Sequence, residues 1–353
     1  MKIENFISYE QPTNYIVHSD QYTKDGQIPV LTAGQSFVLG YTDEEDGIYT
    51  GEPVVIFDDF TTSVQYVDFP FKVKSSAMKI LKNKQNANIK FCYYLLSWLQ
   101  KMPPNHKRQW ISTTSQIDVN LPPIEWQKKI VQKIEAVSNI IKYRKEELKK
   151  LDELVSARFV ELFGDPMTDV SKWRASTIGE QFNVASGGTP ATGEKAYWEN
   201  GTIPWIGSNM CQDTILSEND GKFITEEGYA HSSAKWFHKG TVLVALVGAT
   251  IGKTALLRFD TTTNQNIAAI DVTQNAAFSS EFVFYHMQML YSKFMEIGSG
   301  KFKMANQDFI RQLPLICPPI ELQEQFAAFV EQTDKSKVVV STNIVYNIKR
   351  IKT

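Results

Sequence analysis

Residues His106 to Trp110 carry the densest set of ligand-binding side chains in this sequence, reading His-Lys-Arg-Gln-Trp. Cations, an amide and an aromatic ring are the groups with which proteins contact phosphates, bind base edges and stack on bases. The same composition is about equally compatible with an ordinary surface loop. The segment is therefore a candidate nucleic-acid contact, and the surface loop remains the alternative.

Two segments in the second half of the chain have a comparable character. Asn264-Gln265-Asn266 offers amides, which bind adenine through two hydrogen bonds. Residues 298–303, GSGKFK, combine glycines with Lys301 and Lys303. A glycine-rich loop with lysines can follow a groove of DNA. The alternative for the amide run is a turn at the end of a strand.

The segment Gly248–Thr254, GATIGKT, approaches a nucleotide-binding loop. That motif needs four residues between its glycines before Lys-Ser/Thr. Here there are three, and Val247 stands where the first glycine belongs. We interpret Lys253 as a loop cation near a phosphate or a base, with an ordinary solvated lysine as the alternative.

Other constellations do not predict a metal site or a catalytic residue. Asp58-Asp59 has no third ligand at suitable spacing, and acidic turn residues explain it better than a metal site or contacts to cytosine amino groups. The histidines form no triad, and Cys92, Cys211 and Cys317 have no ligand spacing. The sequence also lacks the Asn/Asp-Pro-Pro-aromatic motif of an amino-methyltransferase and a Gly-rich adenosylmethionine loop. We therefore expect no methylation, cleavage or translocation of DNA by this chain itself.

Length and composition predict two ordinary globular domains. The chain has 353 residues, of which 42% are hydrophobic, and its net charge is −2. Because affinity for a duplex comes mainly from cations, DNA binding would need local patches or a partner that supplies phosphate contacts. The start MKIENFISYE predicts no signal peptide, and the longest apolar run, Val242–Val247, is too short for a membrane span. We expect a soluble protein of a reducing compartment.

An internal repeat organises the whole chain. LPPIEWQKKIVQKIE from Leu121 matches CPPIELQEQFAAFVE from Cys317. Weaker matches precede it in the same order, and they indicate two copies of one domain. They pair Ile28-Pro29 with Ile203-Pro204, Val54–Ile56 with Val242–Val244, and FCYYLLSWL from Phe91 with FVFYHMQML from Phe282.

After each Pro-Pro pair, apolar residues recur at alternating steps of four and three, as in a coiled coil, with Arg144 filling one place of the central series. They are Ile130, Ile134, Val137, Ile141, Leu148, Leu151 and Val155 in the centre, and Phe326, Val330, Val340 and Ile344 near the end. Thr333 and Lys337 interrupt the second series. We expect the two helices to pair in an antiparallel fashion; the alternative is that each packs on its own domain.

Two β-rich domains, each followed by Pro-Pro-Ile-Glu-x-Gln and a long helix, resemble the specificity subunits of Type I restriction–modification enzymes. Segments similar to that family include LVGATIGKTALL from Leu246, TNQNIAAI from Thr263 and HKRQWIS from His106. The resemblance implies an α+β fold in which two similar target recognition domains are separated by two long helices that form an antiparallel coiled coil, with a pseudo-twofold internal repeat. The implied bounds are 1–121 and 166–317 for the domains, and 122–165 and 318–353 for the spacer helices.

The resemblance also implies a function. A specificity subunit binds DNA at a bipartite target, one half-site per domain, and docks methyltransferase subunits; a motor–nuclease subunit can join them. S-adenosylmethionine, ATP and magnesium would belong to those partners, in the cytoplasm of a prokaryote. A coiled-coil scaffold without base readout and a stand-alone DNA-acting enzyme remain alternatives.

With this resemblance, a set of polar and cationic loop residues becomes the candidate DNA-contacting set. In the first domain the candidates are Gln35, Thr61, Thr62, Lys74, His106, Lys107, Arg108 and Trp110; in the second they are Thr189, Ser208, Asn209, Lys253, Asn264, Gln265, Lys301 and Lys303.

Overall fold

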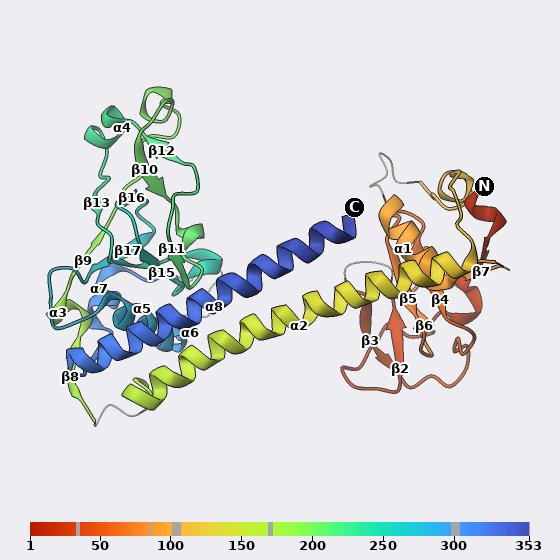
Figure 1. Cartoon of the computed structure of the whole chain (residues 1–353), viewed down its shortest axis with the longest axis horizontal. Helices are drawn as coiled ribbons and strands as arrows, with labels where there is room; N and C mark the ends of the chain where they lie inside the picture. The colour runs from red at the N-terminus through yellow and green to blue at the C-terminus, as the bar shows by residue number, and fades with distance from the viewer. Residues whose placement is uncertain (33–35, 85, 101–106, 169–171, 298–303, 353) are drawn as a thin grey trace. The chain divides into compact units, whose positions relative to one another are not determined.

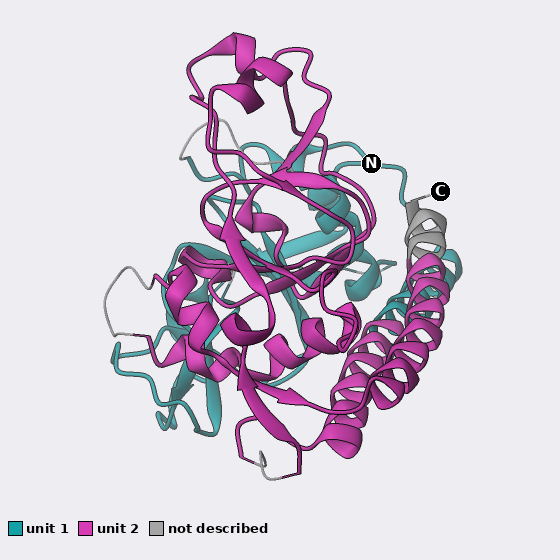
Figure 2. Cartoon of the chain, turned by 90° about the vertical axis from the view of Figure 1, so that its left-hand side faces the viewer, with its two compact units in different colours: residues 1–142, 347–353 teal, residues 143–346 magenta. Residues whose placement is uncertain are grey.

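A computed structural model describes residues 1–352 except 33–35, 85, 101–106, 169–171 and 298–303 (Figure 1). The chain divides into two compact units (Figure 2). Unit 1 contains residues 1–142 and 347–353, and unit 2 contains residues 143–346. The predicted combination of β-sheets with helices is confirmed, whereas the predicted domain bounds stay a prediction.

The main sheet of unit 1 has the strand order β1-β7-β4-β5, and all its pairs are antiparallel. Its strands are β1 (Ile7–Glu10), β7 (Met78–Asn83), β4 (Val54–Asp58) and β5 (Val64–Val67). Alternate residues of β4 enter two different cores: Val55 and Phe57 face one, and Val54 and Ile56 face the other. Because side chains alternate along a strand, a fully apolar strand indicates a sheet that is covered on both faces.

One face of this sheet is covered by α1 (Ile89–Leu99), whose Cys92 and Leu96 join the first core. The other core contains residues of a small sheet ordered β3-β2-β6, formed by β3 (Val38–Thr42), β2 (Ile28–Leu31) and β6 (Lys72–Val73). Short 3-10 helices η1 (Ile3–Asn5), η2 (Pro12–Tyr15) and η3 (Thr114–Gln116) connect these elements. The long helix α2 (Ile124–Phe163) then runs from unit 1 into unit 2.

Unit 2 has a main sheet ordered β11-β15-β14-β17-β9, in which only the β11–β15 pair is parallel. Its strands are β11 (Thr214–Leu216), β15 (Thr254–Leu257), β14 (Val242–Ala245), β17 (Ile267–Asp271) and β9 (Asn183–Ser186). A second sheet is ordered β12-β10-β16-β13, from β12 (Phe223–Ile224), β10 (Ile203–Ile206), β16 (Thr261–Thr263) and β13 (Trp236–Phe237).

The chain reaches and leaves the body of unit 2 through one antiparallel pair, β8 (Arg174–Thr177) with β18 (Pro314–Cys317). In unit 1 a bridge between Lys2 and Asp118 occupies the equivalent place. The helices of unit 2 are α3 (Ile178–Gln181), α4 (Glu226–Ala230), α5 (Ser280–Met289), α6 (Tyr291–Met295), α7 (Gln307–Gln312) and α8 (Ile320–Lys352), of which α8 continues into unit 1. No helix in the described part of the chain is long and apolar enough to cross a membrane.

The two units share one strand order. Strands β1-β7-β4-β5 of unit 1 correspond to β9-β17-β14-β15 of unit 2, and each sheet is followed along the chain by an apolar helix, α1 or α5. The small sheets also agree, since β2 pairs antiparallel with β3 and parallel with β6, as β10 does with β12 and β16. The segments matched in the sequence lie in these equivalent elements.

A buried histidine distinguishes the core of unit 2. His286 of α5 has no exposed surface, its Nε2 lies 2.9 Å from the carbonyl oxygen of Pro314, and its ring stacks on Phe282 at 5.7 Å. Burial lowers the pKa of His286 to about 4, because water cannot solvate the imidazolium, and the bond to Pro314 opposes this only in part. The imidazole is therefore neutral at pH 7.

This histidine makes the stability of unit 2 dependent on pH. Below its unfolded pKa near 6.5 the unfolded chain takes up a proton that the folded chain refuses until about pH 4. Stability is therefore lost as the pH falls through this window, by about 2–3 kcal/mol between pH 7 and pH 4.5. Replacement by the leucine that unit 1 carries at the equivalent position, His286→Leu, should remove that part of the loss. The measurement is the urea-unfolding free energy of unit 2 at both pH values; an equal loss in both proteins contradicts the prediction.

Candidate nucleic-acid interface

In unit 1, a tight turn follows strand β4. The Asp58 carboxylate accepts hydrogen bonds from the backbone N–H groups of Phe60 and Thr61, at 2.8 and 3.1 Å. Thr62 takes a left-handed conformation with φ of 61°. The aspartate thus has the turn-forming role expected of acidic residues after a buried strand.

Asp59 ties this turn to the polar loop that the sequence singled out. Its carboxylate is buried and accepts from the backbone N–H groups of Gln109 and Trp110, at 3.1 and 2.8 Å. The same carboxylate lies 3.1 Å from the ammonium of Lys79, which is buried as well. One buried ion pair therefore brings Thr61 and Thr62 next to the loop that carries Lys107 and Arg108.

The prediction that Trp110 stacks on DNA is not supported by its position. Its indole is 1% exposed and packs edge-on against Phe57 at 5.1 Å. The ring anchors the loop in the core, and Lys107 and Arg108 remain exposed. A tryptophan next to cations in a sequence does not reveal which of the neighbours turns inward.

Lys74 belongs to the same edge of unit 1. It is exposed directly after β6, and the segment that follows it reaches the turn, since the N–H of Asp59 donates to the carbonyl of Ala77 at 3.1 Å. Gln35 and His106 lie outside the described residues. The structure therefore gathers Thr61, Lys74 and Arg108 on neighbouring segments.

In unit 2, the predicted amides converge where β10 and β16 end. The N–H of Asn264 donates to the carbonyl of Ile206 at 3.1 Å. The hydroxyl of Thr189 donates to Oε1 of Gln265 at 2.6 Å. Gly207 lies against both predicted asparagines, because a Cβ there would stand 2.7 Å from Oδ1 of Asn209 and 3.7 Å from Nδ2 of Asn264.

Beside these amides lies a hollow of about 390 Å³. Ser208 lies next to Asn209 in the 3-10 helix η5 (Ser208–Met210), at the end of β10. The polar side chains that line the hollow are Ser186, Ser233, Lys235, Gln265, Asn266, Asn306 and Gln307. Of these, Ser186, Ser233, Lys235, Asn306 and Gln307 were not among the sequence candidates, because the three segments that carry them are far apart in the chain and have no motif spacing.

Lys253 does not join this group. Its ammonium lies 2.5 Å from the carboxylate of Asp213 and 4.7 Å from the centre of the Tyr291 ring. The carboxylate also accepts from the N–H and hydroxyl of Thr254. The charge of Lys253 is thus compensated within unit 2, and we do not count it among the residues that face DNA. Lys301 and Lys303 lie outside the described residues.

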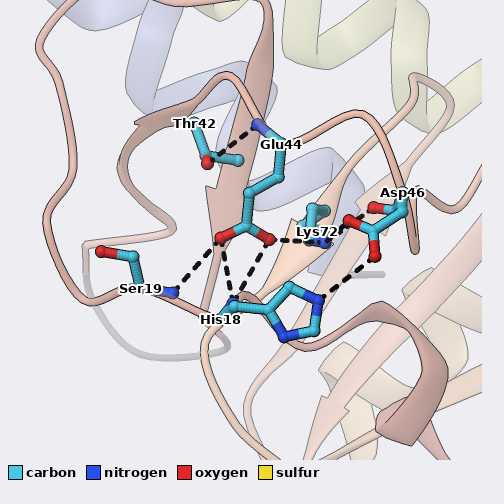
Figure 3. Close-up of polar contacts among 6 residues, drawn as sticks. All are labelled: His18, Ser19, Thr42, Glu44, Asp46 and Lys72. Atoms are coloured by element: carbon cyan, nitrogen blue, oxygen red, sulfur yellow. Dashed lines mark hydrogen bonds and ion pairs between the residues drawn. The ribbon is translucent and has the colours of Figure 1, made fainter.

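Among the described residues, His18, Glu44 and Asp46 form a group with the spacing of metal ligands (Figure 3). The buried ammonium of Lys72 already lies 2.7 Å from both the Glu44 carboxylate and the Asp46 carbonyl oxygen. Burial raises the pKa of Glu44, but the bonds from Lys72 and from the N–H groups of His18 and Ser19 outweigh it and leave the pKa lowered. We interpret the group as an ion-pair cluster in which the lysine takes the place of a cation.

Helices α2 and α8 contact each other within unit 2. Phe159 lies 5.4 Å from Phe326 between ring centres, and the carboxylate of Asp152 lies 2.9 Å from the ammonium of Lys337. As the residue number falls in α2 it rises in α8, so the two segments run in opposite directions. Of the predicted packing residues, Val155, Phe326, Val330 and Val340 are buried, and Ile130, Ile134, Val137, Ile141, Leu148, Leu151 and Ile344 are half-buried.

The sequence model of the family described as "Type I restriction modification DNA specificity domain" matches residues 3–153 and 170–350, which is nearly the whole chain. The chain belongs to this family. The specificity subunit is the component of a Type I system that recognises the DNA sequence, so the resemblance drawn from the repeated motif is confirmed.

Relatives and solved structures agree with this membership. This chain shares 35% identity over 293 residues with the specificity subunit of the Type I restriction enzyme EcoR124I/EcoR124II of Escherichia coli. The alignment covers 78% of this chain and 71% of the relative. Its fold is similar to the crystal structure of the S subunit from M. genitalium, with a TM-score of 0.60 and 14% identity over all of this chain and 93% of that one. A chain from a structural study of assembly and conformational transition of the type I R-M system gives a TM-score of 0.61 at 17% identity, over all of this chain and 94% of that one.

The ion pair behind the Arg108 loop predicts a stability effect in unit 1. Lys79→Met leaves the buried carboxylate of Asp59 without its cation, which should lower the unfolding free energy by about 3–5 kcal/mol. Adding Asp59→Asn should recover at least half of that loss, because the amide oxygen still accepts from the two loop N–H groups. Urea unfolding of unit 1 measures both changes. If the unfolding free energy of Lys79→Met alone lies within about 1 kcal/mol of that of the unchanged protein, the ion pair does not hold the loop.

Proposed function

We propose that this specificity subunit reads a bipartite DNA target, with one half-site contacted by the polar loops of each unit. The observation that carries the proposal is a shared frame with different loops. The turn after β4 in unit 1 carries the exposed Thr61, beside the buried Thr62, next to exposed cations, whereas in unit 2 the amides lie at the ends of β10 and β16. A repeated frame with divergent polar loops suits two different half-sites.

The side chains suggest how each half-site is bound. Arg108 has a planar fork that can bind guanine with two hydrogen bonds, and Lys107 and Lys74 suit phosphates. Gln265, Asn264 and Asn209 suit adenine, and Lys235 beside them suits a phosphate. With a net charge of −2, the chain needs further phosphate contacts from partner subunits for tight binding.

We also propose that α2 and α8 form an antiparallel coiled coil that spaces the two reading units. The contacts of Phe159 with Phe326 and of Asp152 with Lys337 support this, as does the half-buried stripe along α2. Lys337 interrupts the apolar series, but its ammonium is paired with both Asp152 and Asp334, so the interruption is compensated.

The chain acts through partners in this proposal. We expect it to dock methyltransferase subunits, to which a motor–nuclease subunit is added, and to carry out no chemistry itself. S-adenosylmethionine, ATP and magnesium then bind to those partners.

The proposal predicts that one substitution in each unit alters one half-site only. Arg108→Ala should cost about 1–3 kcal/mol of binding if the arginine reads a guanine, and should relax the sequence preference in one half-site. Gln265→Ala should relax the other half-site and leave the first intact. The measurement is the set of methylated sites in the DNA of cells that carry the complete system, read by methylation-sensitive sequencing.

Two exposed residues away from these loops serve as controls. Arg174→Ala removes the same charge and Gln132→Ala the same amide, and neither should change either half-site. If Arg108→Ala altered both halves of the target together, the assignment of one half-site to each unit would be wrong.

The spacer predicts a second effect. Deleting one heptad, Arg144–Lys150, shortens α2 by about 10 Å and keeps its apolar stripe in phase. Because duplex DNA rises about 3.4 Å per base pair, the preferred gap between half-sites should shrink by up to about three base pairs. Bending or twisting of DNA can reduce the shift. The same sequencing measures the gap.

Deleting only Lys149 and Lys150 is the matched comparison. Two residues rotate the stripe away from its partner helix, so methylation should fall at every spacing. An unchanged gap in an active, folded heptad-deletion protein would show that the helices do not set the spacing.

A further inference from the structure

The glutamine of each Pro-Pro-Ile-Glu-x-Gln motif is completely buried, although it stands in the first turn of a long, largely exposed helix. Gln127 of α2 and Gln323 of α8 both have 0% exposed surface. Their neighbours Lys128 and Glu324 are exposed. Because a buried amide must be satisfied by partners inside the protein, each glutamine has to be held by specific contacts.

In unit 1, the amide of Gln127 joins three backbone groups from two parts of the chain. Its oxygen accepts from the N–H of Asn88 at 2.8 Å. Its nitrogen donates to the carbonyl oxygens of Asn86 at 2.9 Å and Pro122 at 2.8 Å. Asn88 is the N-cap of α1, so the glutamine fastens the start of the domain helix to the start of α2.

Gln323 repeats this arrangement in unit 2. Its oxygen accepts from the N–H of Ser279 at 2.9 Å, and its nitrogen donates to the carbonyls of Ala277 at 3.0 Å and Pro318 at 2.9 Å. Ser279 is the N-cap of α5. The same three bonds therefore join the domain helix to the long helix in both units.

A neighbouring contact is not shared in this way. In unit 1, Lys90 of α1 is paired with Glu135 of α2 at 2.6 Å. At the equivalent places unit 2 has Glu281 and Glu331, two acids, and Glu281 pairs instead with Arg258 at 2.7 Å. Among the described residues, the glutamine bonds thus form a polar connection between domain and helix that is the same in both units.

We propose that Gln127 and Gln323 are positioning residues for DNA recognition: each fixes the angle of its reading unit on the spacer helix, and so fixes which gap between half-sites is accepted. This inference rests on the proposed function. One base pair corresponds to a rotation of about 34° around a duplex of about 10.5 base pairs per turn. A loosened junction would let a unit meet half-sites that are displaced by one base pair.

The two glutamines should differ in importance. In unit 2 the junction is reinforced by Phe326 of α8, which is buried against Phe159, Phe163 and Tyr285. At the equivalent place unit 1 has Ile130, which is only half-buried. Unit 1 therefore depends more on its glutamine.

The test uses Gln127→Met and Gln323→Met, which keep the length of the side chain and remove its hydrogen bonds. Each protein is assembled with its modification subunits and given duplexes whose half-sites are separated by the preferred gap or by one base pair more or fewer. The ratio of methylation at the preferred gap to that at its neighbours should fall about five- to tenfold for Gln127→Met, as expected if the three lost hydrogen bonds together contribute about 1–1.4 kcal/mol to the choice of gap, and less for Gln323→Met. The exposed Gln132→Met and Gln325→Met are matched controls and should keep the ratio of the unchanged protein.

The outcomes separate the inference from the function on which it rests. If total methylation falls but the ratio stays the same, the glutamines only stabilise the fold and the inference is wrong. If the unchanged protein directs methylation to no bipartite site, the proposed function fails instead.

A distance measurement tests the same inference on the chain alone. Spin labels at the exposed positions Lys133 of α2 and Asp68 of the first domain, with Cys317→Ser to remove the half-buried thiol, report the angle within unit 1. Gln127→Met should broaden the distance distribution, and Gln132→Met should not. An unchanged distribution in Gln127→Met overturns the inference even if that protein no longer supports methylation.

Discussion

In unit 2, the rings of Phe159 and Phe163 from α2 meet Phe282 of α5 and Phe326 of α8 at centroid distances between 4.9 and 5.6 Å. Each ring is completely buried, and burying one such side chain contributes about 1.5–3 kcal/mol. Because the rings come from three helices, no single helix can form this core. The reading domain of unit 2 and the segments of both long helices that touch it therefore fold as one body, and the geometry of its loops depends on that shared core.

Ion pairs inside the units also hold the loops in place. Lys72, Lys79 and Lys253 are held by acidic partners within their own unit, and two of these lysines are completely buried. Removing one partner of such a pair is costly because the remaining charge is left in a medium that solvates it poorly. Cations that hold loops in place are not available for phosphates, so a count of lysines overstates the surface that can meet DNA.

The sequence predicted the repeated frame well and the orientation of single side chains poorly. The repeat, the buried strand β4 and the two long helices follow from patterns that span many residues. Such patterns still predict the element when the orientation of one side chain is misjudged. Trp110 and Lys253 were both assigned to DNA, yet one enters the core and the other pairs with Asp213, about 40 residues away in the chain. Lys235, Asn306 and Gln307 were missed for the converse reason: only the folded sheet brings them to one hollow. The importance of the motif glutamines could have been inferred, since both copies keep a glutamine at the same place in the first turn of a long helix.

The pairing of β8 with β18 places the beginning and the end of the unit 2 body on adjacent strands, and the bridge between Lys2 and Asp118 does the same in unit 1. A segment whose two ends are neighbours can be replaced by a homologous one without moving the helices to which it is attached. At the level of the gene, a recombination event could have both crossovers in the codons of such a pair of neighbouring segments. It would exchange the body of one unit and preserve the long helices. If the polar loops of each unit read DNA as proposed, a single exchange of this kind would change one half of the target, because the paired segments at which the exchange occurs lie outside those loops.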